Sequence, residues 1–248
     1  DAGVEALSRR LQADATSVQV GTAADGRVDG ERVDRATAPA EAHGADLAIA
    51  GFMAGGVAAA PLNEKDFREI KPAQSVEPGP KVEVIEFFWY GCPHCFELEP
   101  SLKKWLDRKP DDVTFKRVPA IFRQSWVAGA QTYYTLETMG ELDRMHGKVF
   151  DAIHVDRQAF NDIGTIATWM SKNGIDGKKF EDTAKSFAVS GKVQRAQQMS
   201  AAYQLTGVPA LVVDGKYIAL GNSYEGMLVI VDQLIERARG ERAAAAKK

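Results

Sequence analysis

Residues 82–106, with the sequence VEVIEFFWYGCPHCFELEPSLKKWL, limit the possible folds of this chain more than any other segment. The part up to Tyr90 consists mostly of β-branched and aromatic residues, which is typical of a strand buried on both faces. Gly91 interrupts this run. After Cys92 the apolar residues recur at a helical spacing, so the sequence predicts a buried strand that leads directly into a helix.

The two cysteines of the chain lie at the predicted start of this helix, in the order Cys92-Pro93-His94-Cys95. Pro93 suits the first helical turn, where its missing N–H is not needed. Unpaired N–H groups and the helix dipole favour an anion at this end, so Cys92 lies where a thiolate is stabilised. We predict that Cys92 is the exposed nucleophile and Cys95 the resolving thiol. We also predict that His94 stabilises the thiolate, the alternative being an ordinary solvated helix residue.

A Cys-x-x-Cys pair could instead be half of a structural zinc site. Such a site normally uses four Cys or His ligands, and the chain contains no second cysteine pair. His43 belongs to a different kind of segment, and His146 and His154 lie far downstream. Two cysteines are also too few to staple a secreted domain. We therefore predict redox chemistry without a metal or a cofactor.

A second motif lies far downstream, where Thr206-Gly207-Val208-Pro209 precedes an apolar strand at residues 210–213. A Val-Pro bond just before a strand suits a cis peptide, which is essentially confined to proline. The two motifs together place a Cys-x-x-Cys helix and a proline loop in one domain.

With these residues the chain resembles the DsbA family of thiol:disulfide oxidoreductases. The matching segments are FFWYGCPHC and GVPALVVDGKY, with Glu86 six residues before Cys92, and the similarity runs over residues 65–239. The resemblance implies a thioredoxin fold and an oxidase of reduced, unfolded or newly exported polypeptides. It also implies a bacterial periplasm as the compartment and a DsbB-type membrane protein as the reoxidant.

The resemblance further implies roles for three residues outside the CPHC segment. Glu86 would assist proton transfer to or from the inner cysteine, and its position in the strand places it on the face that lies beneath the cysteines. Its alternative is an exposed edge carboxylate, which we expect Glu83 to be. Val208 would place its backbone beside Cys92, where it can pair with an extended substrate strand. Pro209 would keep metal-binding groups away from the thiolate, its alternative being simply a turn before a strand.

Two other classes of function stay open at this point. The closest is a thioredoxin-like disulfide reductase or isomerase, which a reduction potential would distinguish from an oxidase. The second is a non-catalytic module that binds peptides or carries a metal. Trp89, Tyr90 and Phe122 could form an apolar surface toward a substrate, or pack in the core as such side chains commonly do.

The pattern around the two motifs predicts an α/β protein, a thioredoxin fold with an inserted all-helical domain. A second strand is expected at residues 113–118, a hairpin turn at Asp214-Gly215 and a last helix at 227–239. The insertion is expected at about residues 124–204, where glycines and helix-capping residues divide the sequence into separate helices. The helices expected there are 126–139, 142–154, 162–173, 176–187 and 190–205.

The N-terminal segment differs from the rest of the chain. Residues 1–46 are polar and contain no aromatic residue, whereas 47–60 read LAIAGFMAGGVAAA. This run is too short to span a bilayer, and its length and small-residue end fit a signal region without its usual basic start. The alternative is a helix end followed by a strand at 41–52. We expect residues 1–60 to be dispensable, 61–240 to form the catalytic domain and 241–248 to be a frayed tail.

The net charge of −3 and the lack of a concentrated basic segment argue against nucleic acid as a partner. We expect a monomer.

Overall fold

The computed structural model describes residues 62–247, so the predictions for residues 1–60 lie outside the described part of the chain. Its elements follow one another as β1 (Phe67–Glu69), β2 (Val82–Phe88), α1 (Pro93–Arg108), β3 (Val113–Pro119), the short 3₁₀ helix η1 (Gln124–Trp126), α2 (Val127–Met139), α3 (Leu142–His154), α4 (Ile163–Lys172), α5 (Gly177–Ala184), α6 (Phe187–Ala202), β4 (Ala210–Val213), β5 (Tyr217–Ala219) and α7 (Tyr224–Ala245).

The strands form a single five-stranded sheet in the order β1-β5-β4-β2-β3. β2 pairs in parallel with β3 and antiparallel with β4, and the pairs β4–β5 and β1–β5 are antiparallel. All seven residues of β2 are buried, as expected for a strand covered on both faces. The mixed sheet and its helices confirm the predicted α/β fold.

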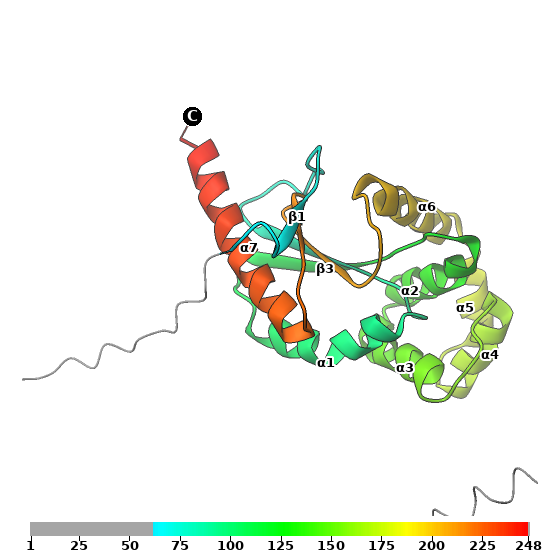
Figure 1. Cartoon of the computed structure of the whole chain (residues 1–248). Helices are drawn as coiled ribbons and strands as arrows, with labels where there is room; N and C mark the ends of the chain where they lie inside the picture. Colours follow the sequence, from blue (N-terminus) through cyan, green and yellow to red (C-terminus); the bar gives the residue numbers. More distant parts are fainter. Residues whose placement is uncertain (1–61, 248) are drawn as a thin grey trace, which may run out of the picture. The chain divides into compact units, whose positions relative to one another are not determined.

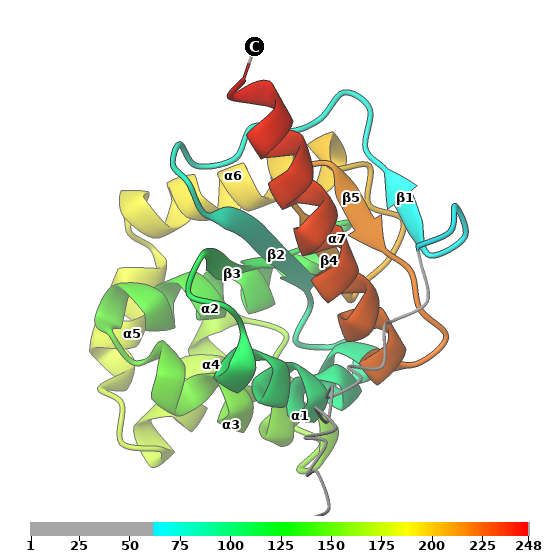
Figure 2. The same ribbon diagram turned by 90° about the vertical axis from the view of Figure 1, so that its left-hand side faces the viewer.

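Helices cover both faces of the sheet. In Figure 2, α7 lies in front of the sheet and α6 lies behind it. Val84 packs with Leu98 of α1 and Leu228 of α7 in one core. The next residue, Ile85, belongs to a second core on the opposite face together with Phe87, whose ring lies 5.0 Å from the ring of Tyr203. Successive residues of β2 therefore contribute to two different cores.

The helices α2 to α6 follow β3 and precede β4, and they gather on one side of the sheet (Figure 1). The N-caps of α4, α5 and α6 are Asp162, Asp176 and Ser186, whose side chains accept bonds from backbone N–H groups. The cap at Ser186 corrects one boundary: α5 ends at Ala184, and Phe187 begins α6 instead of ending α5. None of the helices within residues 62–247 is long and apolar enough to span a membrane.

The last helix is longer than predicted. α7 spans Tyr224–Ala245, and the expected frayed tail at 241–248 is wrong for the residues up to 245. Arg242 donates to the backbone oxygen of Gly79 at 3.0 Å and to that of Lys81 at 2.9 Å. These bonds fasten the end of the helix to the segment before β2, which supplies tertiary contacts that local sequence does not reveal.

The hairpin turn at Asp214 and Gly215 is present as predicted, with φ angles of +54° and +65°. A side chain at Gly215 would also place its Cβ 2.2 Å from the backbone oxygen of Gln74, so glycine is needed there. The turn joins β4 to β5, and β5 pairs with β1, a three-residue strand that the sequence did not predict.

Glu83 corrects another prediction. It is only 3% exposed, and its carboxylate lies 2.6 Å from the Nζ atom of Lys116. The expected solvent-facing edge does not exist, because β3 and the second core cover that face of β2.

Candidate active site

The two cysteines lie where β2 ends and α1 begins. A tight turn connects the elements, in which the Cys92 N–H donates to the Trp89 oxygen at 2.9 Å. A Cβ atom at Gly91 would lie 2.3 Å from the Trp89 ring, so this turn requires glycine to let the indole fold back over it. Cys92 is the N-cap of α1 and Pro93 occupies its first turn, as predicted.

The two thiols differ in accessibility. Cys92 is 8% exposed and Cys95 is fully buried, and neither forms a disulfide. Cys92 is therefore less exposed than the sequence suggested, yet it is the thiol that another molecule can reach. Cys95 can react only with a sulfur already brought to Cys92.

Hydrogen bonds make Cys92 acidic. The Cys95 thiol is the main donor to its sulfur, followed by the backbone N–H groups of Cys95 and His94, and together they lower the pKa of Cys92 to about 6 against the opposing effect of burial. Donors at a helix N-terminus are expected to stabilise a thiolate in this way. The Cys92 sulfur is therefore largely ionised at neutral pH.

Cys95 has the opposite electrostatics. Burial is the largest effect and raises the pKa of Cys95, and the Cys92 sulfur and the charge of Glu86 raise it further. Cys95 thus keeps its proton under conditions in which Cys92 has lost its own. This asymmetry stabilises the reduced dithiol, which is the property of a pair that readily gives its disulfide away.

The proline loop lies beside the nucleophile. The Val208–Pro209 peptide bond is cis, as the sequence predicted. The Cys92 sulfur lies 3.4 Å from the Val208 carbonyl oxygen, toward which its thiol points. The backbone that precedes β4 is therefore the part of the protein next to the reacting sulfur.

The side chain of His94 is placed differently from the prediction. Its Nδ1 atom lies 3.3 Å from a Glu97 carboxylate oxygen and 3.2 Å from the Tyr224 hydroxyl. Tyr224 donates to the same Glu97 oxygen at 2.6 Å. The bond from His94 to the Cys92 sulfur comes from its backbone N–H, and its ring acts on Cys92 only through its charge. Tyr224, which starts α7, decides where this ring points.

Replacing His94 with leucine is therefore expected to raise the pKa of Cys92 only modestly, by about half a unit, because the backbone donor stays and the lost charge is solvent-screened. Thiolate absorbance measured against pH gives the midpoint. Lys103→Leu removes a cation from the exposed side of the same helix and should leave the midpoint unchanged. A shift of two units or more in the His94 variant would show that the ring itself is a principal donor.

Glu86 lies under the cysteines on β2 and is fully buried. Arg117 stands directly opposite in the β2–β3 register, and its Nε atom donates to a Glu86 carboxylate oxygen at 2.8 Å. The other oxygen of Glu86, Oε1, has no hydrogen-bond partner in the described part of the chain. Burial, only partly offset by the charge of Arg117, raises the pKa of Glu86 to about 8.

Arg117 also contacts a second carboxylate. Its Nη2 atom donates to the two oxygens of Glu99, on α1, at 3.1 and 3.3 Å. The Nε2 atom of His146, on α3, lies 3.4 Å from Glu99, and its Nδ1 atom lies 2.8 Å from the Tyr90 hydroxyl. A buried polar chain therefore leads from Glu86 to Tyr90, which lies two residues before the nucleophile.

The backbone of Tyr90 is held by the same helix. The Nε2 atom of His154, at the end of α3, donates to the Tyr90 carbonyl oxygen at 2.8 Å, and its ring stacks on Phe96 at 4.9 Å. The helical insertion thus contacts the segment before Cys92 through two histidines. Sequence reasoning considered His146 and His154 only as zinc ligands and found no other use for them.

The sequence did contain a partial signal for this network. Two acids in the otherwise apolar β2, Glu83 and Glu86, and two cations in the adjacent β3, Lys116 and Arg117, are unusual enough to suggest buried pairs. The involvement of Glu99 and His146 could not be found in this way, because it depends on how α1 and α3 pack against the sheet.

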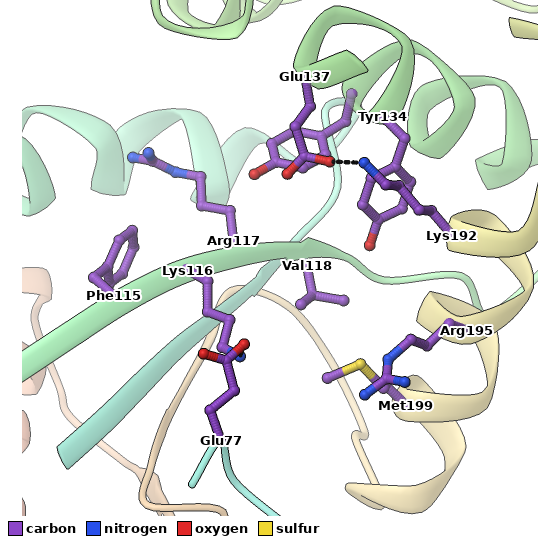
Figure 3. A pocket seen from close by; sticks show the side chains of 11 residues that line it. Glu77, Phe115, Lys116, Arg117, Val118, Tyr134, Glu137, Lys192, Arg195 and Met199 are labelled. Carbon is purple, nitrogen blue, oxygen red and sulfur yellow. Dashed lines mark hydrogen bonds and ion pairs between the residues drawn. The ribbon is translucent and has the colours of Figure 1, made fainter. Parts of the chain in front are cut away.

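A pocket of about 600 Å³ opens beside Arg117, between β3, α2 and α6 (Figure 3). Figure 3 shows Arg117 and Lys116 leaving β3 in opposite directions, with Lys116 turned toward Glu77. No residue of the CPHC segment lines this pocket. This pocket is therefore not the site at which the dithiol reacts with a substrate. Arg117 is the residue that connects the pocket to the active site.

An aromatic surface lies next to the turn before Cys92. The rings of Trp89 and Trp126 are stacked 4.3 Å apart, and Phe122 packs against Trp126 at 4.9 Å. Phe122 is 39% exposed, whereas Tyr90 is buried. Of the three aromatic residues considered for a substrate surface, Phe122 and Trp89 reach solvent and Tyr90 belongs to the core.

Between residues 62 and 247 no group of three His, Cys, Asp or Glu side chains could hold a metal ion.

Comparisons with known proteins agree with this site. The model of the DSBA-like thioredoxin domain matches residues 83–229. The thiol:disulfide interchange protein DsbA of Pseudomonas aeruginosa is 41% identical over 187 residues, covering 74% of this chain and 87% of that protein. The DsbA of Burkholderia cepacia is 36% identical over 200 residues, covering 79% and 94%. The crystal structure of P. aeruginosa DsbA shares 40% identity with a TM-score of 0.68, covering 74% of this chain and 95% of that one.

These matches include both motifs and extend over most of each relative, so the predicted thioredoxin fold with its helical insertion is confirmed. The chain belongs to the DsbA family of thiol:disulfide oxidoreductases.

Proposed function

We propose that this protein donates the Cys92–Cys95 disulfide to reduced polypeptides newly exported to the bacterial periplasm. The observation that carries the proposal is the asymmetry of the dithiol, with a stabilised Cys92 thiolate and a protonated, buried Cys95. Each pKa unit by which the thiolate is stabilised below ambient pH favours the reduced dithiol by about 1.4 kcal/mol, or roughly 30 mV. Donating the disulfide to a substrate dithiol is thereby favoured over the reverse reaction, in which the reduced enzyme gives its electrons to a substrate disulfide.

The reaction proceeds by two thiol–disulfide exchanges. A substrate thiolate attacks the Cys92 sulfur, the bond between Cys92 and Cys95 breaks, and Cys95 takes the electron pair and a proton from Glu86. The second substrate thiolate then attacks the substrate sulfur of the mixed disulfide and expels the Cys92 thiolate. The substrate loses two electrons and the enzyme dithiol gains them. Glu86 recovers its proton from water.

The surroundings of Cys92 suit an extended, partly apolar substrate. The backbone of Val208 lies against the Cys92 sulfur, where a substrate strand can pair with it before β4, while Pro209 keeps the loop in its conformation. Trp89 and Phe122 offer apolar surface nearby. Unfolded polypeptides expose both free backbone and apolar side chains, which is why we propose them as substrates.

Repeated turnover requires an oxidant for the reduced dithiol. By its membership of the DsbA family we assign this step to a DsbB-type membrane protein. That protein would accept the two electrons through attack of the Cys92 thiolate on its disulfide, followed by attack of Cys95 on Cys92. Cys95 must lose its proton in this step, and Glu86 can receive it.

The reduction potential tests the direction of electron flow. Equilibration of the full chain in glutathione buffers should give a potential near that of DsbA, the family's namesake at about −120 mV, and well above the value of about −270 mV for thioredoxin. The trapped fraction of reduced protein can be measured by mass after alkylation. A value near that of thioredoxin would reject the oxidase assignment in favour of a reductase.

A further inference from the structure

Glu86 is the end of a buried chain of polar groups whose other members have no part in the exchange reaction described above. This polar chain runs from Tyr90 through His146, Glu99 and Arg117 to Glu86, and its members come from the segment before α1, from α1 itself, from β2, β3 and α3. The side chain of His146 is 9% exposed and that of Glu99 is 21% exposed. A side chain of the helical insertion thereby connects to the carboxyl group beneath Cys95.

The hydrogen bonds assign the tautomer of His146. The Tyr90 hydroxyl is buried, and within residues 62–247 its hydrogen-bond partner is the Nδ1 atom of His146. If Tyr90 donates to Nδ1, then Nε2 carries the proton and donates to the Glu99 carboxylate at 3.4 Å. The other tautomer would turn a lone pair of Nε2 toward the carboxylate and leave the Tyr90 proton without an acceptor. Neutral His146 with its proton on Nε2 therefore gives a hydrogen bond to the Tyr90 hydroxyl, to both ring nitrogens and to the Glu99 carboxylate.

Arg117 is a single cation between two carboxyl groups. Glu86 is fully buried and receives one N–H bond, whereas Glu99 is partly solvated and receives bonds from both Arg117 and His146. Two buried carboxylates that share one cation favour a state in which one of them keeps a proton. Burial opposes ionisation of Glu99, but the bond from His146 and the charge of Arg117 outweigh it and lower the pKa of Glu99.

We propose that His146 is a positioning residue of the disulfide exchange: its Nε2–H bond keeps the negative charge on Glu99 and thereby leaves the proton on Glu86 for Cys95. The proposal rests on the proposed function, in which Glu86 supplies that proton. The Oε1 atom of Glu86, which has no hydrogen-bond partner in the described part of the chain, is available to carry it.

The charged and titratable groups around His146 are consistent with a neutral imidazole. Tyr90 and Glu99 bond to its two nitrogens. The charge of Arg117 on β3 disfavours protonation, whereas the hydrogen bond and charge of Glu99, and to a smaller extent Asp143 on its own helix, favour it. Tyr133 of α2 contacts the ring edge-on at 6.0 Å. Burial is the largest effect and lowers the pKa of His146, so the imidazole is a donor to Glu99 and not a second cation.

The test compares two replacements of His146 in the full-length oxidised protein. His146→Leu removes the donor to Glu99, whereas His146→Gln keeps an amide N–H that can reach it. The titration midpoint of Glu86 is followed by the ¹³C resonance of labelled glutamate carboxyl groups, with Glu86→Gln used to assign the signal. The rate of a single exchange with a reduced peptide is measured over the same pH range.

We expect the leucine variant to lower the Glu86 midpoint by about one unit or more, and to move the alkaline limb of the rate profile by the same amount. The glutamine variant should restore both. In Glu99→Gln the titration midpoint of Glu86 should fall as it does in His146→Leu. The double variant that carries both substitutions should show no further shift of this midpoint.

An unshifted Glu86 midpoint in His146→Leu, while Glu86→Gln still slows the exchange, would overturn the role of His146 alone. Equal shifts in the leucine and glutamine variants would also overturn it, because the donor would not matter. If Glu86→Gln leaves the exchange rate unchanged, the supply of a proton by Glu86 fails, and the proposal for His146 fails with it. A loss of thermal stability in His146→Leu without a midpoint shift would mean that the residue is structural only.

Discussion

Replacing Cys95 with alanine is expected to trap a covalent complex between Cys92 and a substrate, whereas replacing Cys92 should abolish trapping completely. In the parent the pKa of Cys92 is about 6. Cys95→Ala removes the main thiol donor and raises this pKa, but the backbone N–H groups of residues 94 and 95 still stabilise a thiolate. This thiolate can attack a peptide disulfide, and without Cys95 no internal thiol resolves the mixed disulfide. Cys95 is fully buried and its pKa is raised, so it is neither reachable nor ionised when Cys92 is absent.

The measurement is the mass of the protein after incubation with a peptide disulfide and separation without reductant. The double variant, with alanine at both positions, is the control for non-covalent retention. The Cys95 variant should carry one peptide per chain, released by reductant, and the Cys92 variant should carry none. Equal trapping by the two single variants would contradict the assignment of Cys92 as the nucleophile and Cys95 as the resolving thiol.

Replacing Glu86 with glutamine should stabilise the oxidised protein at alkaline pH and have little effect near pH 4.5. Glutamine keeps an oxygen that can accept the bond from Arg117, but it cannot become a buried charge. The pKa of Glu86 in the folded protein, about 8, is raised above that of an unfolded glutamate, about 4.3. A carboxyl group of this kind contributes its stability below the unfolded pKa, and that contribution is lost as the pH rises through the folded pKa.

The window for this effect is therefore about pH 4.5 to 8. By pH 9 the difference in unfolding free energy between the variant and the parent should be on the order of 5 kcal/mol in favour of the variant, or roughly 10–20 °C in Tm. Thermal denaturation of the oxidised proteins at pH 5 and pH 9 measures it, since oxidation prevents Cys92 from titrating.

Glu99→Gln is a control in which the unfolding free energy should change with pH in the opposite direction. The pKa of Glu99 is lowered in the folded protein, so its carboxylate contributes stability above its unfolded pKa and loses it as the pH falls. This variant should be less stable than the parent at pH 9 and close to it in acid. Parallel stability curves for the parent and Glu86→Gln would falsify the inference that Glu86 is a buried, protonated acid at neutral pH.

Local chemistry in the sequence was enough to find the reacting thiols and much of the framework. Cys92 and Pro93 lie at a helix start because Gly91 forms the turn after β2 and proline fits the first helical turn. Asp214-Gly215 predicted the hairpin because both residues must adopt positive φ angles. These features depend on neighbouring residues, so no knowledge of distant contacts was needed.

Tertiary packing decided what those local rules could not. Glu83 was expected to be an exposed edge carboxylate, but β2 lies between β4 and β3 in the sheet, and the residue is buried against Lys116. The Nδ1 atom of the His94 ring contacts the hydroxyl of Tyr224, which is 130 residues away in the chain. The ring therefore acts on Cys92 less directly than its sequence position suggested.

The carboxyl network is the clearest case of this difference. Glu86, Glu99 and His146 come from β2, α1 and α3, and only the docking of the helical insertion brings them to Arg117. From the sequence, Glu86 was predicted on the face of the strand beneath the cysteines, with an exposed edge carboxylate as the alternative. The tertiary structure alone decided which of two carboxyl groups holds the proton, because that depends on burial and on donors supplied by elements distant in the chain.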